Sequence, residues 1–460
     1  MTRFAIILVA TLLAAGCDGG SGPDSSARTT STTGPAPTTA AGPDAVTTAA
    51  GPDAVTTTTA DAATAEYLEN FEFVWATIDE GFFDPGFGGL DWDAVYDRYL
   101  PQVTAADGDR AFLELMNSML FELDVSHLFV LPPDADFVDP VLTTEGELGI
   151  HVRLLDGEWV ITEVEPGSPA AEAGLRPGYL LDSVNDQPVT DTAASALPLP
   201  PLHERGLRGN QILAVEELLY GEPGEVITVG YRVDGEESQL ATLTFRHRGP
   251  SAELIPGFPP VFTTLDVRRL EGGIGYIRFD PFAPALAAPI LDAVDAMRDA
   301  PGLIIDVRGN HGGASDVGKQ LIDSLVDEPA LIWTFRTRAG SEDIFAEPSA
   351  DPYDGPVVVL VDVASGSASE ALAGGIQAMG RAAVVGERTS GRLLGGEIVE
   401  LPIGALMIYP ITQVVTADGT IVEGRGVIPD IAVTVRRSDL LAGTDPTLQA
   451  AVDYLLSSAG

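Results

Sequence analysis

The stretch VVVLVDVASGSASEALAGGIQAM, residues 357–379, decides the fold of the domain around it. Its first five residues are valine and leucine, a composition that predicts a short strand buried on both faces. The second half, EALAGGIQAM, has the alanine content and the spacing of a helix. Three serines, Ser365, Ser367 and Ser369, therefore lie on a strand-to-helix turn, which exposes a hydroxyl beside the first free helix amides. Either one of them is a nucleophile, or all three are N-cap and turn residues of the kind that serine favours.

Strands and helices alternate through the whole of residues 250–460. The segments GGIGYIRF, GLIIDVRGN and VVVLVD predict strands, and helices are expected between them at 285–298 and 318–326. This alternation predicts a layered α/β domain.

The composition is that of an acidic, globular chain. Its 460 residues are too many for one core and predict two or three domains. Asp and Glu number 68 against 25 Lys and Arg, which gives a formal charge of -43. Because this charge repels a phosphate backbone, no nucleic-acid partner is expected.

The N-terminus has the layout of a signal peptide. MTRFAIILVATLLAAGC, residues 1–17, contains one basic residue, an apolar run and the small-residue end Ala14-Ala15-Gly16-Cys17. It resembles a bacterial lipoprotein signal, in which Cys17 would be lipidated and would anchor the protein to a membrane of the cell envelope, facing the periplasm or the exterior. The alternative is a plain secretory signal and a secreted protein. Since Cys17 is the one cysteine, no intramolecular disulfide is possible.

A change of composition separates the N-terminus from the folded part of the chain. Residues 18–64 are rich in Thr, Ala, Pro, Gly and Ser, and GPDAVTT occurs in them twice, which predicts a disordered tether. Apolar residues at helical spacing then predict an N-terminal helical domain at 65–142. This domain includes FELDVSHLFV, whose Ser126 and His127 lie between a helix and a strand.

Short strands and Gly/Pro turns fill residues 143–249. Here GELGIHV and WVITEVEPGSPAAEAGLRPGYLLDSVNDQPV closely resemble a PDZ domain. In that family a loop, matched by Leu148-Gly149-Ile150, binds a peptide's terminal carboxylate while the peptide adds a strand. The segment 190–216 departs from a compact PDZ domain, which leaves the peptide specificity open.

Four segments in order resemble the C-terminal processing and tricorn-type serine peptidase family. They are the PDZ-like domain, LIIDVRGNHGG, the stretch from VVVLVD to GERTSG, and IVEGRGVIPDI. The resemblance implies a multidomain α/β protein, in which a ClpP/crotonase-like α/β catalytic domain is combined with a PDZ-like β domain and an N-terminal helical domain. It also implies a serine-type endopeptidase that acts on polypeptides and needs no cofactor.

The nucleophile and the residue beside it follow from this resemblance. The family attacks through the middle serine of an SxSxSE pattern, which is matched here by Ser367. In the tail-specific branch the base is a lysine 25 residues further on, but residue 392 of this chain is arginine. Arginine keeps its proton at every accessible pH and cannot be the base. Arg392 could instead pair with a substrate carboxylate or with Glu387, or be only a surface charge.

Two interpretations follow from this arginine: catalysis has been lost, or another residue is the base. His127 favours the second, because the tricorn-like branch takes its base from a Ser-His pair that LDVSH matches. The same branch supplies a glutamate ahead of a GVxPDI segment, and Glu423 matches it. The resemblance therefore implies a triad of Ser367, His127 and Glu423, with Ser126 as an auxiliary hydrogen-bonding residue.

Other residues complete the expected site. His311, in the segment NHGG, is either a rival base or a loop residue of variable type. The resemblance implies an oxyanion site formed by the amides of Ala368 and of Gly312 or Gly313. No pair of histidines or cysteines has the spacing of metal ligands, so no metal is expected.

Three functions are compatible with these residues. The favoured one is an exported, lipid-anchored serine peptidase that hydrolyses extended or C-terminal polypeptide segments through acylation of Ser367. The second is a catalytically degenerate lipoprotein of the same fold that binds peptides or other ligands, which the missing lysine favours. The third is an esterase with the same triad.

Overall fold

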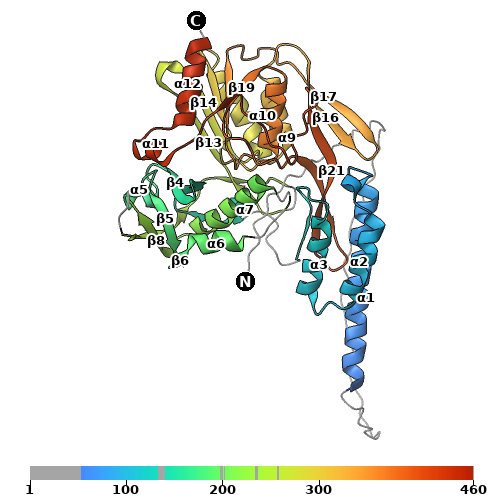
Figure 1. Cartoon of the computed structure of the whole chain (residues 1–460). Coiled ribbons are helices and arrows are strands. Elements are labelled where there is room, and N and C mark those ends of the chain that lie inside the picture. The colour runs from blue at the N-terminus through green and yellow to red at the C-terminus, as the bar shows by residue number, and fades with distance from the viewer. Residues whose placement is uncertain are drawn as a thin grey trace, which may run out of the picture.

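Three structural regions follow one another along the chain (Figure 1). The computed structural model describes residues 53–132, 140–196, 200, 203–233, 237–255 and 258–458. Cys17, the predicted signal peptide and most of the predicted tether lie outside these ranges. Helix α1 (Asp53–Gly81) begins upstream of the tether boundary predicted at residue 64, because no proline or glycine interrupts the Thr/Ala run after Pro52. Within the described ranges, no helix combines the length and the apolarity needed to cross a membrane.

A six-stranded sheet forms the centre of the C-terminal region, in the order β13-β14-β15-β18-β19-β22. Its strands are β13 (Thr264–Arg269), β14 (Gly275–Asp280), β15 (Leu303–Asp306), β18 (Val357–Val361), β19 (Ala382–Gly386) and β22 (Ile431–Ala432). All neighbours pair in parallel except β13 and β14. Every residue of β18 is buried, as the run VVVLV predicts for a strand covered on both faces.

Helices cover both faces of this sheet, which confirms the prediction of a layered α/β domain. On one face pack α8 (Ala287–Ala296), α9 (Ser315–Asp323) and α10 (Ala368–Ala378). On the other face packs α12 (Pro446–Ser458). The helices predicted at 285–298 and 318–326 are confirmed as α8 and α9.

Helix α10 is buried almost throughout, which its small side chains make possible. Trp333 lies against it and donates its indole N–H to the Ala371 carbonyl over 3.0 Å. A Cβ atom at Gly375 would lie 2.6 Å from the Trp333 Nε1 atom, so a larger residue would push the tryptophan away. This close packing fixes the turn that precedes α10.

A second, antiparallel sheet joins the N-terminal helices to the C-terminal region. Its strands are β1 (Phe129–Leu131), β16 (Ala330–Thr337), β17 (Gly340–Ala346), β20 (Leu394–Glu400) and β21 (Leu406–Thr416). Strand β1 pairs with β21, and α1, α2 (Trp92–Thr104) and α3 (Asp109–Phe121) share an apolar core with that strand. The predicted helical domain 65–142 is thus not a separate unit, because its core includes β21 side chains such as Met407.

The middle region contains the expected PDZ-like sheet, in the order β3-β4-β5-β8-β9, with β3 at its edge. The strands are β3 (Ile150–Leu155), β4 (Glu158–Val164), β5 (Leu180–Val184), β8 (Val226–Arg232) and β9 (Gln239–Thr244). The segment 190–216 includes most of α6 (Val189–Ser195) and the whole of α7 (Glu204–Glu216). Helix α7 packs against β3 and also contacts the C-terminal region, where its Gly206 carbonyl accepts from Arg392.

The other elements are short and connect these layers. They are η1 (Phe87–Gly89), α4 (Pro140–Thr143), β2 (Gly146–Glu147), α5 (Pro169–Glu172), β6 (Gln187–Pro188), η2 (Glu217–Leu219), β7 (Tyr220–Gly221), β10 (Arg246–His247), β11 (Ser251–Ala252), β12 (Val261–Phe262), η3 (Glu271–Gly273), η4 (Pro284–Leu286) and α11 (Arg437–Leu441). Strands β10, β2 and β7 form a small sheet where the PDZ-like region meets the C-terminal region.

Candidate active site

The three serines of the turn between β18 and α10 have different roles. Ser365 donates its hydroxyl to the Val307 carbonyl, and Ser369 donates to that of Asn310, each over 2.8 Å. Both bonds hold the turn against the loop that follows β15. Ser367 has a φ of 53°, a left-handed conformation that is uncommon for a residue with a side chain. Its Oγ atom lies 3.3 Å from Nε2 of His127, so Ser367 is the serine whose hydroxyl faces an imidazole.

The carboxylate of Glu370 stabilises this turn through hydrogen bonds. It is fully buried and accepts hydrogen bonds from three amides and two hydroxyls. The donors are the amides of Ser367 (3.2 Å), Gly391 (2.7 Å) and Arg392 (2.8 Å) and the hydroxyls of Thr389 (2.5 Å) and Ser390 (3.3 Å). Burial raises the pKa of Glu370, and the bonds from these donors oppose the rise. One side chain thus fixes the nucleophile and the segment 389–392 relative to each other.

His127 comes from the loop between α3 and β1 and is 6% exposed. Its Nδ1 atom lies 2.7 Å from the Ser126 hydroxyl, which in turn donates to Glu423 Oε2 over 2.9 Å. The contact expected between Glu423 and His127 is therefore indirect, with Ser126 between the two. The amides of Ser126 and Leu393 hold the Glu423 carboxylate in this place, each over 2.7 Å.

The chain of hydrogen bonds from Glu423 through Ser126 to His127 sets the tautomer of His127. An ionised Glu423 can only accept, so the Ser126 hydroxyl donates to it and accepts from the Nδ1–H group of His127. The Nε2 atom then carries no proton and faces the Ser367 hydroxyl, as a general base requires.

Burial gives the charged groups of the site unusual pKa values. It lowers the pKa of His127 to about 3, and the nearby Arg392 cation adds to this effect. Burial also raises the pKa of Glu423 to about 7 and lowers that of Arg392 to about 10. At neutral pH His127 is therefore uncharged and able to accept a proton, whereas Arg392 keeps its own.

Arg392 lies inside the protein and is not a surface charge. The residue is 7% exposed, and its Nη2 group donates to the Gly206 carbonyl over 2.9 Å and to the side-chain oxygen of Asn210. Both acceptors belong to α7. Within the described part of the chain the guanidinium contacts this helix and not Glu387, the other partner considered for it.

The amides expected in the oxyanion site differ in their availability. Ala368 is the first residue of α10, so its amide has no acceptor within the helix. Gly312, with a φ of 116°, lies close by, since a Cβ atom there would be 2.9 Å from that of Ser367. The Gly312 amide, however, donates to the Asn310 side chain over 2.9 Å, which removes it as an oxyanion donor in this conformation. The geometry leaves Ala368 and Gly313 as the candidates.

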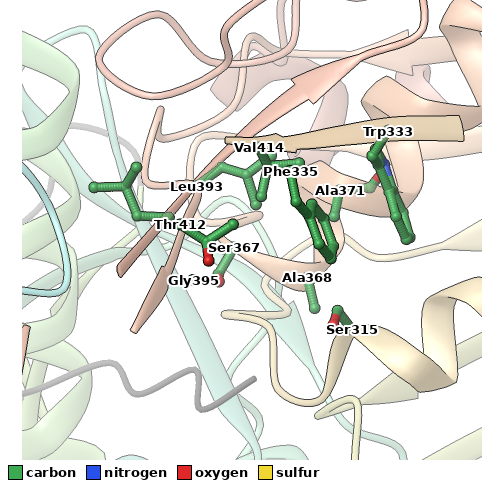
Figure 2. A pocket seen from close by; sticks show the side chains of 11 residues that line it. Ser315, Trp333, Phe335, Ser367, Ala368, Ala371, Leu393, Gly395, Thr412 and Val414 are labelled. Carbon is green, nitrogen blue, oxygen red and sulfur yellow. The ribbon is translucent and has the colours of Figure 1, made fainter. Parts of the chain in front are cut away.

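A narrow apolar pocket, with a free volume of about 20 Å³, opens beside Ser367 and Ala368 (Figure 2). Its walls come from the second sheet and from α10, and they include Trp333, Phe335, Ala371, Leu393 and Val414. The rings of Trp333 and Phe335 are stacked with centroids 6.1 Å apart. A pocket of this size and lining accepts at most a small apolar group next to Ser367.

His311 is buried in the loop after β15, and burial lowers its pKa to about 4. The charges that act on it most strongly, Glu216 and Arg153, belong to the PDZ-like region. Since the imidazole opposite the Ser367 hydroxyl is that of His127, this geometry does not support His311 as the rival base.

The predicted carboxylate-binding loop, Leu148-Gly149-Ile150, leads into the edge strand β3. Gly149 has a φ of 69°, and a Cβ atom there would lie 2.4 Å from that of Ser168, so the loop requires glycine. An edge strand beside a helix, here β3 beside α7, is the arrangement to which a peptide adds as a further strand.

Arg153 of β3 connects the PDZ-like region to the nucleophile turn. It donates to Glu216 of α7 over 2.7 Å and to Asp362, directly after β18, over 3.0 Å. Sequence reasoning missed this residue, for which no local pattern exists. It also missed the role of Glu370, although the final position of the SxSxSE pattern marks that residue.

Comparison with known protein families gives three matches. Residues 273–433 match the model of peptidase family S41, residues 63–121 match the tricorn protease C1 domain, and residues 160–196 match a PDZ domain. The matches follow the three structural regions in order.

Curated relatives and solved structures agree with these matches. The chain is 27% identical over 391 residues to the carboxyl-terminal-processing protease of Synechocystis sp., covering 83% of this chain and 85% of that protein. It is 26% identical over 417 residues to the putative tricorn protease homolog 2 of Streptomyces coelicolor, covering 85% of this chain but 32% of that protein. The photosystem II D1 C-terminal processing protease has a similar fold, with a TM-score of 0.53 at 23% identity over 80% of this chain and 93% of that structure.

We expect Glu370→Gln to destabilise the fold, because its side-chain NH2 would face at least one buried donor that now bonds a carboxylate oxygen. The free energy of unfolding should fall by about 1 to 3 kcal/mol, measured by denaturant unfolding. Glu400→Gln, an exposed site on β20, is the matched control and should change it by less than about 0.5 kcal/mol. Equal stabilities of the two variants would contradict the role given to Glu370.

Proposed function

We propose that this chain is a serine-type endopeptidase of the C-terminal processing kind with a family S41 peptidase domain, in which Ser367 is the nucleophile and His127 the base. The observation that carries the proposal is the 3.3 Å approach of the Ser367 hydroxyl to the His127 Nε2 atom. Ser126 and Glu423 then act as a relay that holds the imidazole in its basic tautomer.

Acylation follows from this arrangement. His127 takes the Ser367 proton while Oγ attacks the scissile carbonyl, and the amides of Ala368 and Gly313 stabilise the oxyanion that forms. The C–N bond then breaks, and His127 gives its proton to the departing amine. His127 then takes a proton from water, which attacks the acyl-enzyme ester. The C–Oγ bond breaks, His127 returns the proton to Ser367 Oγ, and the new carboxyl terminus is released.

The substrate is an extended polypeptide segment with a small apolar residue at the cleavage point. The apolar pocket lined by Trp333 and Phe335 supports this specificity on the acyl side. The edge strand β3 and the loop Leu148-Gly149-Ile150 support delivery of an extended peptide or of its C-terminus.

A fluorophosphonate probe tests the nucleophile and the base together. We expect the adduct, located by mass spectrometry, at Ser367 only, and a labelling rate lower by roughly 10²-fold to 10⁴-fold in His127→Ala. His311→Ala should label at nearly the wild-type rate, with folding of each variant checked by circular dichroism. Labelling that survives in His127→Ala and fails in His311→Ala would move the base to His311, and no Ser367 adduct in folded protein would favour a ligand-binding protein.

The pH dependence reports the state of Glu423. Because burial raises its pKa to about 7, Glu423 is ionised above that pH and protonated below it, where the relay no longer holds the basic tautomer. We therefore expect kcat/KM to rise through about pH 7 and to level off above it. The pKa of His127, about 3, lies too low to produce this step.

Glu423→Gln removes the titrating group, so the step near pH 7 should disappear and kcat/KM on the plateau should fall on the order of 10²-fold. A step that persists unchanged in Glu423→Gln would assign it to another group.

We also propose that Cys17 is lipidated and that the protein is held at a membrane of the cell envelope. The small residues Ala14-Ala15-Gly16 before it and the Thr/Ala/Pro-rich segment after it support an anchored enzyme on a spacer. Cys17→Ser should shift the protein from the membrane fraction, while Ser21→Ala should not. A mature N-terminus that mass spectrometry finds downstream of Cys17, or without a lipid mass, would mean a secreted protein.

A further inference from the structure

Arg392 is a buried cation that contacts no anionic group within the described part of the chain. Among the residues that the structure describes, its guanidinium bonds to the uncharged acceptors Gly206 and Asn210. Its Nε–H group is buried and has no acceptor in the described part of the chain. A buried, unpaired charge is costly, so a protein that keeps one beside its nucleophile has a charge available for an anionic ligand.

The neighbouring carboxylates are already engaged elsewhere. Glu423 and Glu370 are the acidic groups that act on Arg392 electrostatically. Glu423 accepts from Ser126 and Leu393, and Glu370 accepts from the amide, not the guanidinium, of Arg392. The guanidinium charge is therefore left for a group that enters from outside.

Arg392 lines a small, partly open cavity, with a free volume of about 30 Å³, that Ser367 and His127 also line. The remaining walls are largely apolar and include Phe121, Phe129 and Pro200. An anion that enters this cavity meets one positive charge in apolar surroundings, where a charge-assisted hydrogen bond is strong.

The chemistry of acyl transfer indicates which part of the substrate occupies this cavity. The amide of Ala368, which is to hold the oxyanion, borders the apolar pocket, so the acyl side of the substrate lies there. His127 delivers its proton to the departing amine, and His127 borders the cavity that contains Arg392. The departing segment therefore occupies the Arg392 side of the nucleophile.

We propose that Arg392 binds a carboxylate of the departing segment, immediately after the scissile bond. This inference rests on the proposed function, since it takes Ser367 as the nucleophile and deepens the specificity of the same site. The carboxylate is either the chain terminus of a substrate cut close to its end or the side chain of an Asp or Glu. In both cases Arg392, which stands where the resemblance places a lysine base, contributes to substrate specificity.

A different role for Arg392 would be structural, as a clamp that holds α7 against the nucleophile turn through Gly206 and Asn210. A clamp affects all substrates alike, whereas a carboxylate receptor affects the ratio between charged and neutral substrates. The ratio is therefore the quantity to measure.

Four matched peptides with the same apolar residue before the cleavage point provide that ratio. The first ends one residue after the scissile bond in a free carboxylate, and the second is its amide. The third is longer, ends in an amide and has Glu directly after the scissile bond, and the fourth has Gln there. Cleavage by the full-length protein gives kcat/KM, and fluorescence anisotropy gives Kd for Ser367→Ala, which cannot cleave. Both are repeated with Arg392→Gln, and Arg388→Gln, in the same loop but outside the cavity, is the control.

We expect a preference of about 10-fold to 100-fold for one carboxylate peptide over its neutral partner. This preference should vanish in Arg392→Gln and persist in Arg388→Gln. Preference for the first peptide over the second identifies a chain terminus, and preference for the third over the fourth identifies an acidic side chain.

Absence of both preferences in the wild-type protein would overturn the proposal. So would a preference that persists in Arg392→Gln, which would belong to the PDZ-like loop. If no peptide is cleaved, the proposed peptidase mechanism fails, and the anisotropy measured with Ser367→Ala still decides whether Arg392 binds a carboxylate.

Discussion

The buried carboxylate of Glu370 is the interaction on which the site depends. Its donors belong both to the turn between β18 and α10 and to the segment 389–392. Glu370 therefore fixes the position of Ser367 relative to Arg392. The next residue, Leu393, donates its amide to Glu423, which extends the same constraint to the relay behind His127. The cost of burying this charge is offset because five donors surround it. The geometry around Ser367 therefore depends on one polar cluster in which every hydrogen-bonding group of Glu370 is satisfied.

The residues around Ser367 come from all three structural regions. His127 and Ser126 follow α3, and their position depends on the pairing of β1 with β21. Ser367, Arg392 and Glu423 belong to the C-terminal region, and the PDZ-like region adds α7, which contacts Arg392 and, through Arg205, the backbone beside Glu423. A displacement of α7 relative to the C-terminal region would alter the surroundings of both the base and the cation.

The sequence predicted the layered α/β domain because the signals involved are local: a run of valines specifies a buried strand and an alanine-rich segment specifies a helix. The selection of Ser367 and His127 came instead from the resemblance to the peptidase family, and the core that the N-terminal helices share with β21 was not predicted. The insertion of Ser126 between His127 and Glu423 was not predictable, since it depends on where two backbone amides hold a distant carboxylate. For the same reason the hydrogen bond from the Gly312 amide to the Asn310 side chain could not be predicted. The burial of Arg392 against α7, which is distant in sequence, could not be predicted either.

The arginine at position 392 affects the chemistry of His127. Burial is the main cause of the lowered pKa of His127, and the guanidinium beside the imidazole further disfavours the imidazolium form. In the proposed mechanism, positive charge develops on His127 in the transition state for acylation. An unpaired Arg392 therefore raises the activation barrier of this step. A carboxylate bound at Arg392 would neutralise the opposing charge at the moment when His127 takes the proton. A substrate with such a carboxylate would thus lower the activation barrier as well as bind in the cavity. Arg392 would discriminate against peptides that lack a carboxylate at this position.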